Sequence, residues 1–163
     1  MIVVADTSPL TALLHLKQLS LLATLYGEIY IPFIVAEELQ TLVQFGYDIS
    51  FLNDKERYII RKATDILFMQ DLRERLDEGE IEAIALAKEL KADLLLIDER
   101  LGKQFAEQEH ITCKGVIGVL IEAKQKGLIP LLKPLLDDLI HNLHFRLSDY
   151  IYQLALNKAN ELP

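Results

Sequence analysis

The sequence predicts a three-layer α/β/α sandwich around a central parallel sheet. Short apolar runs alternate with longer helix-forming segments through most of the chain, as in folds whose parallel sheet is covered by helices on both faces. The run DLLLI (93–97) is compact and apolar, which suits a strand buried on both faces. The 163 residues and the 51% apolar content predict a single domain, 1–163, with a substantial core.

Five strands are expected, each from a short apolar run bounded by polar, Gly or Pro residues. They are IVVA (2–5), EIYI (28–31), DILFM (65–69), DLLLI (93–97) and ITC (111–113). The dipeptide Ser8-Pro9 after the first run is typical of a helix N-cap followed by proline in the first turn.

Helices are expected between these strands. Their expected ranges are 9–16, 19–26, 32–44, 54–64, 78–90, 100–108, 116–127, 131–142 and 147–160. Pro32 suits a first helical turn, while Gly46 and Gly127 suit helix ends. The segment 78–90 is rich in the strong helix formers Ala, Leu, Glu and Lys. The last helices, about 131–160, are expected to pack on the domain or to form an oligomer interface.

Composition and missing motifs narrow the range of functions. The net charge of −8 argues against a broad basic surface for nucleic acid, but it is compatible with a nuclease whose carboxylates bind cations. The phosphate-binding patterns GxGxxG and GxxxxGK[ST] are absent, which disfavours the common dinucleotide and NTP sites. Cys113 is the only cysteine, so no intrachain disulfide can form. Without a signal peptide or an apolar run of transmembrane length, the sequence predicts a cytoplasmic protein.

Two of the expected strands end in aspartate. Asp6 follows IVVA, and Asp98 follows the run LLLI. Because the carboxyl ends of parallel strands line one edge of a sheet, where ligands bind, both carboxylates are expected at the same rim. Capping of the following helices is the alternative reading for each of them.

Glu38 is expected on the buried face of its helix. It lies four residues after Ile34 and four before Leu42, whereas Glu37 points away from this apolar stripe. A carboxylate that faces a core must be paired or must bind a metal, because burial of an isolated charge costs several kcal/mol. A buried ion pair therefore remains open as the alternative.

The helix EGEIEAIALAKEL (78–90) carries further carboxylates. Glu78 and Glu80 lie in the first turn, where acidic side chains interact favourably with the helix dipole. Glu82 lies deeper and is less well explained by that effect. If Asp6, Glu38 and Glu82 share the rim with Asp98, hard divalent cations such as Mg²⁺ or Mn²⁺ would relieve their repulsion and would suit phosphodiester cleavage.

Four motifs together resemble the PIN domain, the nuclease fold of VapC-type toxins and related RNases. They are VVADTS, VAEEL with Glu38-Leu39, GEIEAIALA and LLID with Asp98. DTSPL, LLIDERLG and GVIGVLIEAKQKGLIP further resemble an uncharacterised PIN-like subgroup. The resemblance runs along nearly the whole chain, but the segment 45–76 is longer than in compact toxins.

The resemblance implies a catalytic centre. The residues it implies as ligands of Mg²⁺ or Mn²⁺ are Asp6, Glu38, Glu82 and Asp98. The hydroxyl of Ser8 would orient Asp6 or a metal-bound water. Glu80 and Glu99 are further candidates, and the third acidic position, often Asp in toxins, is Glu82 here.

The resulting hypothesis is a metal-dependent endoribonuclease, and the toxin of a toxin–antitoxin pair is one role that fits it. Its expected partners are an RNA substrate, an antitoxin protein and further copies of the chain in a homodimer or higher homo-oligomer, with no membrane. The alternative is an inactive PIN-fold module that binds nucleic acid or protein. An aspartate-nucleophile phosphatase is disfavoured, because such enzymes usually carry another Asp two residues on, where Ser8 stands.

Other residues give weaker signals. His141 and His144 are expected on one helix face, but a zinc site needs further ligands. The lysines that could contact phosphates are Lys124, Lys126 and Lys133. The apolar stretches GLIPLLKPLL (127–136) and LSDYIYQLAL (147–156) suit an oligomer interface, an antitoxin groove or ordinary core packing.

Overall fold

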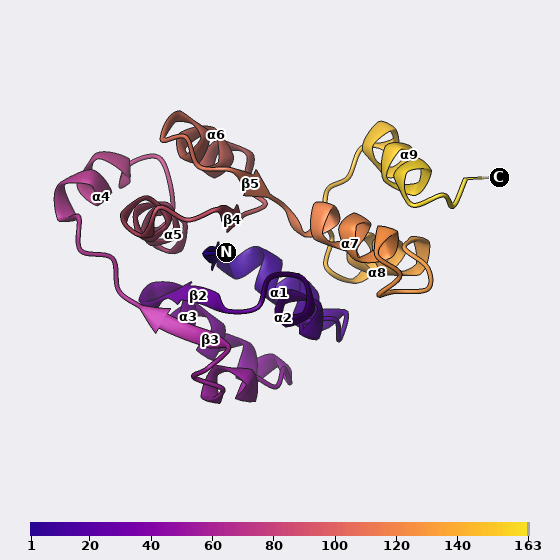
Figure 1. Ribbon diagram of the computed structural model, residues 1–163, viewed down its shortest axis with the longest axis horizontal. Helices are drawn as coiled ribbons and strands as arrows, with labels where there is room; N and C mark the ends of the chain where they lie inside the picture. The colour runs from indigo at the N-terminus through magenta and orange to yellow at the C-terminus, as the bar shows by residue number, and fades with distance from the viewer. Residues whose placement is uncertain (163) are drawn as a thin grey trace.

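The computed structural model describes residues 1–162 and places a five-stranded sheet between two layers of helices (Figure 1). The strands are β1 (Val3–Ala5), β2 (Ile29–Pro32), β3 (Tyr58–Arg61), β4 (Leu94–Leu96) and β5 (Cys113–Lys114). They are parallel throughout, in the order β3-β2-β1-β4-β5. β1 and β4 are therefore neighbours at the centre, and the residues that follow them meet at one edge of the sheet.

The two helix layers bury alternate side chains of the strands. In β4, Leu94 and Leu96 join one core and Leu95 joins the other, with Ile97 beside it. The first core contains residues of α1 (Thr7–His15), α2 (Ser20–Tyr26), α3 (Phe33–Gln40), α7 (Val116–Gln125), α8 (Lys133–Asn142) and α9 (Asp149–Lys158). The second contains residues of α4 (Ile66–Leu72), α5 (Glu78–Leu90) and α6 (Arg100–Gln108). The predicted three-layer α/β/α fold is confirmed.

The segment 54–72 differs from its predicted structure. The expected helix 54–64 contains β3 instead, and the expected strand 65–69 belongs to α4. β3 pairs with β2 in the register Ile29↔Tyr58 to Pro32↔Arg61, so a run of β-branched and aromatic residues extends the sheet. α4 begins after Asp65, whose carboxylate accepts the N–H of Phe68 at 3.1 Å. The strand at 65–69 was wrong because a short apolar run has no period that separates a strand from a helix. The helix at 54–64 was wrong because the segment looked helical with its charges on one side, whereas pairing with β2 makes part of it a strand.

The start of α1 also differs from the prediction. The helix begins at Thr7, so Asp6 and not Ser8 occupies the N-cap position. The carboxylate of Asp6 makes no capping hydrogen bond, and the hydroxyl of Ser8 donates to Asp98 at 3.3 Å. The side chain of Asp6 therefore remains free for another role.

The C-terminal helices contribute to the core as well as to the surface. Leu136 of α8 and Leu156 of α9 are buried in the first core, whereas Leu131 and Tyr150 are exposed. Core packing thus accounts for part of both apolar stretches. Within residues 1–162, no helix combines the length and apolar character needed to cross a membrane.

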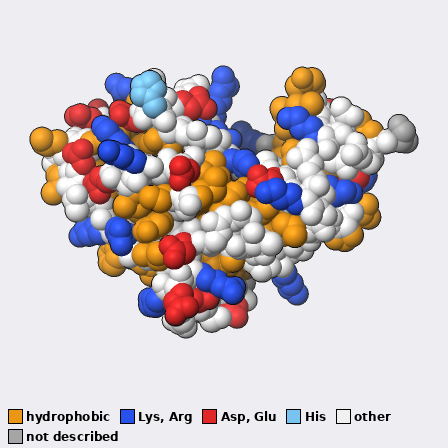
Figure 2. Space-filling view, viewed as in Figure 1, with side chains coloured by type: hydrophobic (Ala, Val, Ile, Leu, Met, Phe, Trp, Pro, Cys, Tyr) orange, Lys and Arg blue, Asp and Glu red, His pale blue; other side chains and the backbone are white. Residues whose placement is uncertain are grey.

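The molecular surface carries both signs of charge. Figure 2 shows acidic and basic side chains interspersed over one face, with apolar side chains between them. The net charge of −8 is therefore not spread as one uniform acidic surface. For function, the carboxylates that are buried close to one another matter more than the net charge.

Candidate functional site

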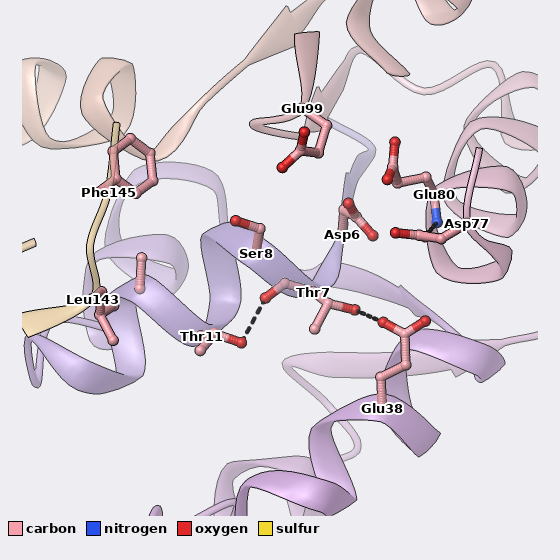
Figure 3. A pocket seen from close by; sticks show the side chains of 11 residues that line it. Asp6, Thr7, Ser8, Thr11, Glu38, Asp77, Glu80, Glu99, Leu143 and Phe145 are labelled. Atoms are coloured by element: carbon pink, nitrogen blue, oxygen red, sulfur yellow. Dashed lines mark hydrogen bonds between the residues drawn. The ribbon is translucent and has the colours of Figure 1, made fainter. Parts of the chain in front are cut away.

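A cavity of about 360 Å³ lies at the edge where β1 ends (Figure 3). Its polar lining comes from α1, α3, the start of α5 and the residue before α6. These residues are Asp6, Thr7, Ser8, Thr11, Glu38, Asp77, Glu80 and Glu99, and the apolar lining is Ala12, Leu143 and Phe145. Five carboxylates therefore converge on one cavity from segments that are far apart in the sequence.

Asp6 is the most buried of these carboxylates. Asp6 directly follows β1, a strand inside the sheet, and its backbone N–H donates to the carbonyl of Leu96 at 2.9 Å. The residue is only 3% exposed. Burial raises the pKa of Asp6 to about 7, against the lowering effect of the Thr7 N–H, and Asp77, Glu38 and Asp98 raise it further. Negative charge at this position is thus poorly compensated by the protein alone.

Glu80 extends from the first turn of α5 into the same cavity. The residue is 7% exposed, and its Oε2 atom is buried without a hydrogen-bond partner among the described residues. Burial raises the pKa of Glu80 to about 8, and the neighbouring Asp77, Asp6 and Glu99 add to the rise. Asp77 itself caps α5 by accepting the N–H of Glu80 at 2.9 Å. A buried carboxylate oxygen that no protein group contacts is suited to interact with a bound water or cation.

Glu38 approaches from α3. The residue is half-buried, and its carboxylate accepts a hydrogen bond from the hydroxyl of Thr7. Figure 3 shows this bond at the side of the cavity near Asp6. Thr7 thereby orients Glu38, and the expected burial of Glu38 on the inner side of its helix agrees with the structure.

Asp98 lies next to this cavity and does not line it. Its carboxylate accepts the N–H of Val116 at 2.9 Å and the hydroxyl of Ser8 at 3.3 Å. Burial raises its pKa, opposed by the Val116 N–H, the ammonium of Lys103 and Ser8. Asp98 therefore caps α7, whereas the expected alternative was that it would cap the helix directly after it, α6. The hydroxyl of Ser8 orients Asp98, and not Asp6 as expected.

The structure does not bring Glu82 to the cavity. The residue is 2% exposed, and its carboxylate accepts the backbone N–H groups of Ile34 at 2.7 Å and Ala63 at 3.3 Å. It thus caps the start of α3 and holds the residue that follows β3. Glu80, two positions earlier on α5, occupies the place at the rim that was expected for Glu82.

Three glycines make room for these carboxylates. A Cβ at Gly79 would overlap Oε1 of Glu38, and one at Gly102 would lie 2.8 Å from Oε2 of Glu80. A Cβ at Gly115 would lie 2.5 Å from Oδ1 of Asp98. Each glycine belongs to a different segment, so this close approach could not be inferred from local sequence.

We expect Gly79→Ala to displace Glu38 with little effect on stability. The added methyl group faces the flexible end of Glu38, and Ala is favoured over Gly in a helix by about 1 kcal/mol. If Glu38 helps to bind a cation, Mn²⁺ affinity measured by calorimetry should fall about 10- to 100-fold. Gly118→Ala is the control, because the atoms nearest to its Cβ would belong to the side chain of Lys114 and not to a carboxylate of the cavity. Equal Mn²⁺ affinity in both variants would exclude Glu38 as a ligand.

Sequence reasoning missed Asp77, the Thr7 hydroxyl and Lys103. Asp77 precedes a helix and matches an N-cap, which concealed its position at the cavity. Thr7 lies in the motif VVADTS but was not assigned a contact. The histidines form no site, because α8 ends at Asn142 and His144 lies beyond it. Two of the lysines contact acidic partners instead, namely Glu161 for Lys124 and Asp137 for Lys133.

The donor set fits a hard divalent cation, although the side chains do not converge on one point. Among residues 1–162, no three His, Cys, Asp or Glu side chains are placed to hold a single metal ion. The side chains that line the cavity nevertheless offer only oxygen donors, and one buried oxygen has no hydrogen-bond partner. Burial, with smaller contributions from neighbouring carboxylates, raises the pKa values of Asp6 and Glu80. Oxygen-rich sets of this kind suit Mg²⁺ or Mn²⁺.

Fold and site together define a parallel α/β domain with a carboxylate-lined pocket beside its two central strands. The chain belongs to the PIN domain family, which it matches over residues 2–161. This is a nuclease fold whose members generally use divalent metal ions. No curated protein is significantly similar in sequence.

A solved structure supports the same fold. The chain is similar to a PilT N-terminus domain protein from the hyperthermophilic archaeon Sulfolobus solfataricus P2, with 20% identity and a TM-score of 0.51. The similarity covers 76% of this chain and 93% of that chain. At this identity the likeness bears on the fold alone.

Proposed function

We propose that the protein is a metal-dependent endoribonuclease whose active site is the carboxylate-lined cavity. The observation that carries this proposal is the buried, unpartnered oxygen of Glu80 beside the buried Asp6. Family membership supports nuclease chemistry, and a role as a toxin held by an antitoxin is compatible with it.

The residues divide into ligands and orienting groups. Asp6, Glu80 and Glu38 would hold a divalent cation, with Asp98 and Asp77 at the margin of the same edge. Such a cation supplies an activated water and stabilises charge on the phosphoryl oxygens. Thr7 and Ser8 hold Glu38 and Asp98 in place through their hydroxyls, which limits the side-chain motion needed to complete the site.

We expect Asp6→Asn to remove saturable Mn²⁺ binding and to lower RNA cleavage at least about 100-fold. The amide is nearly the same size as the carboxylate but carries no charge, so the variant should remain folded. Calorimetric titration with Mn²⁺ and cleavage of a labelled single-stranded RNA measure the two effects. Asp71→Asn, at an exposed position of α4, is the matched control.

The outcomes separate the proposal from its alternative. Unchanged cleavage in Asp6→Asn would assign the activity to another site. A wild-type protein that neither binds Mn²⁺ nor cleaves RNA would instead be a binding module that has kept the fold.

A further inference from the structure

We propose that the connection between α8 and α9, residues 143–148, is the substrate-binding wall of the site. In this arrangement Phe145 stacks on an unpaired base and Arg146 contacts a backbone phosphate of single-stranded RNA. The inference rests on the proposed nuclease function and adds the residues that would hold its substrate.

A second cavity continues the first along this wall. It has a volume of about 400 Å³ and is lined by Ser8, Asp98 and Glu99 on the sheet side. The opposite lining is the run of residues from Leu143 to Arg146. The two cavities share Ser8, Glu99, Leu143 and Phe145. A polymer can therefore lie across both, with one unit at the carboxylates and the next beside the wall.

The backbone of the connection is held in a defined turn. The N–H groups of Leu143 and Phe145 both donate to the carbonyl of Leu139, at 3.2 and 3.0 Å. His144, between them, has a positive φ of 52°, which is the left-handed backbone conformation that commonly ends an α-helix. Phe145 and its neighbours are thus anchored to the end of α8 and are not a free loop.

Phe145 has the position of a stacking platform. Part of its ring packs against the first core, and the residue also lines both cavities. Figure 3 shows Phe145 and Leu143 across the pocket from Asp77 and Glu80. An aromatic ring at the side of a phosphate-cleaving site offers a surface to the base of an adjacent nucleotide.

Arg146 supplies the matching cation. Its side chain is exposed at the second cavity and makes no ion pair or hydrogen bond with any residue in 1–162. Figure 2 shows Lys and Arg side chains in a hollow between α6 and α9, the helices that follow Glu99 and this connection. A guanidinium free to form two parallel bonds suits a phosphate.

Single-stranded RNA is favoured over a duplex because stacking on Phe145 needs a base that has left its helix. Binding is measured by fluorescence anisotropy of a labelled single-stranded RNA in EDTA, so the readout does not depend on cleavage. Arg146→Gln should weaken binding about 3- to 10-fold and reduce the slope of log affinity against log salt by about 0.7. Phe145→Leu keeps an apolar side chain on the core and should weaken binding roughly 5-fold or more.

Two comparisons give the test its specificity. Lys55→Gln removes one exposed positive charge from the turn before β3, at the opposite edge of the sheet, and should change neither affinity nor salt slope. An RNA of equal length with abasic nucleotides should bind wild type more weakly than the intact RNA. Phe145→Leu should lose this preference for bases. In cleavage assays, both wall variants should raise KM more than they lower kcat.

Each failure points to a different hypothesis. If wild type cleaves RNA but Arg146→Gln and Phe145→Leu bind as wild type does, the wall is overturned and the nuclease stands. If wild type binds RNA through both residues yet cleaves nothing, the wall stands and the nuclease assignment fails. The proposal for residues 143–148 is wrong if wild type does not bind RNA, or if Lys55→Gln weakens RNA binding as much as the two wall variants do.

Discussion

Glu80→Gln is expected to abolish cleavage, with a loss of at least about 100-fold, whereas Glu82→Gln is expected to lower stability and to leave cleavage intact. The two residues lie two positions apart on α5 but face different surroundings. Glu80 faces the acidic cavity with a free oxygen, and Glu82 faces two backbone N–H groups. The pair therefore separates the role of binding a cation from that of holding the fold.

The stability effect follows from the hydrogen bonds of Glu82. An amide in its place can accept from one N–H group but presents its own NH₂ to the other. The buried N–H group left unpaired costs about 1–3 kcal/mol, which corresponds to a melting temperature lower by roughly 2–10 °C. Burial raises the pKa of Glu80 to about 8, so the fold favours its uncharged form. Gln is uncharged at every pH, so the melting temperature of Glu80→Gln should be equal to or above that of wild type. Thermal unfolding and cleavage at a temperature where both variants are folded measure these effects.

The opposite result would reverse the assignment. If folded Glu82→Gln loses cleavage and Glu80→Gln keeps it, Glu82 is the ligand, as the resemblance implied. Glu78→Gln, at an exposed position of the same first turn, is the matched control for general effects of removing negative charge from α5.

The metal-free protein is expected to lose stability as the pH rises from about 5.5 to about 8.5. Asp6 and Glu80 have folded-state pKa values of about 7 and about 8, above their ordinary values of 3.8 and 4.5. At pH values between the ordinary and the folded-state pKa of each group, the folded state binds more protons than the unfolded state. The free energy of unfolding therefore falls as the pH rises. The stabilisation is complete below the ordinary values and is lost as the pH rises through 7 and 8. Each carboxyl contributes at most about 2–3 kcal/mol to the decrease over this interval, because solvent screening and their coupling reduce the total.

Denaturant unfolding in EDTA across this pH range measures the effect. Asp6→Asn and Glu80→Gln should each flatten the dependence, and Asp71→Asn should not. Added Mn²⁺ should stabilise wild type more at the high-pH end, because the ion binds the ionised carboxylates of the folded state. A stability that is constant or rises with pH, with no difference between wild type and Asp6→Asn, would contradict the arrangement of charges at the cavity.

Much of the fold could be predicted because its central strands are marked by their own residues. The runs before Asp6 and Asp98 are short and apolar, so their assignment as buried strands was correct, and the structure adds that the two strands pair. The segment around Tyr58 was assigned to a helix, because its strand character depends on pairing with β2. Edge strands of this kind gain their stability from a partner that is distant in the sequence.

The candidate site shows the same division. Asp6 at a strand end and Glu38 on an apolar helix face were predicted from local pattern, and both line the cavity. The local sequence could not decide whether Glu80 or Glu82 faces the cavity, because every residue of α5 from Gly79 to Ala87 is buried. A helix buried on all sides has no polar face that would identify the direction of the site.

The sequence by itself determined the layered parallel fold and the acidic character of the edge where β1 and β4 end, because strand burial and strand-end residues are local properties. Only the tertiary structure decided which carboxylates share the cavity. The N–H groups of Ile34 and Ala63 donate to Glu82, and the hydroxyl of Ser8 donates to Asp98. Among the carboxylates of residues 1–162, Glu80 has a buried oxygen without a hydrogen-bond partner. These assignments depend on where distant backbone donors lie, since a buried carboxylate binds whichever donors the fold brings to it.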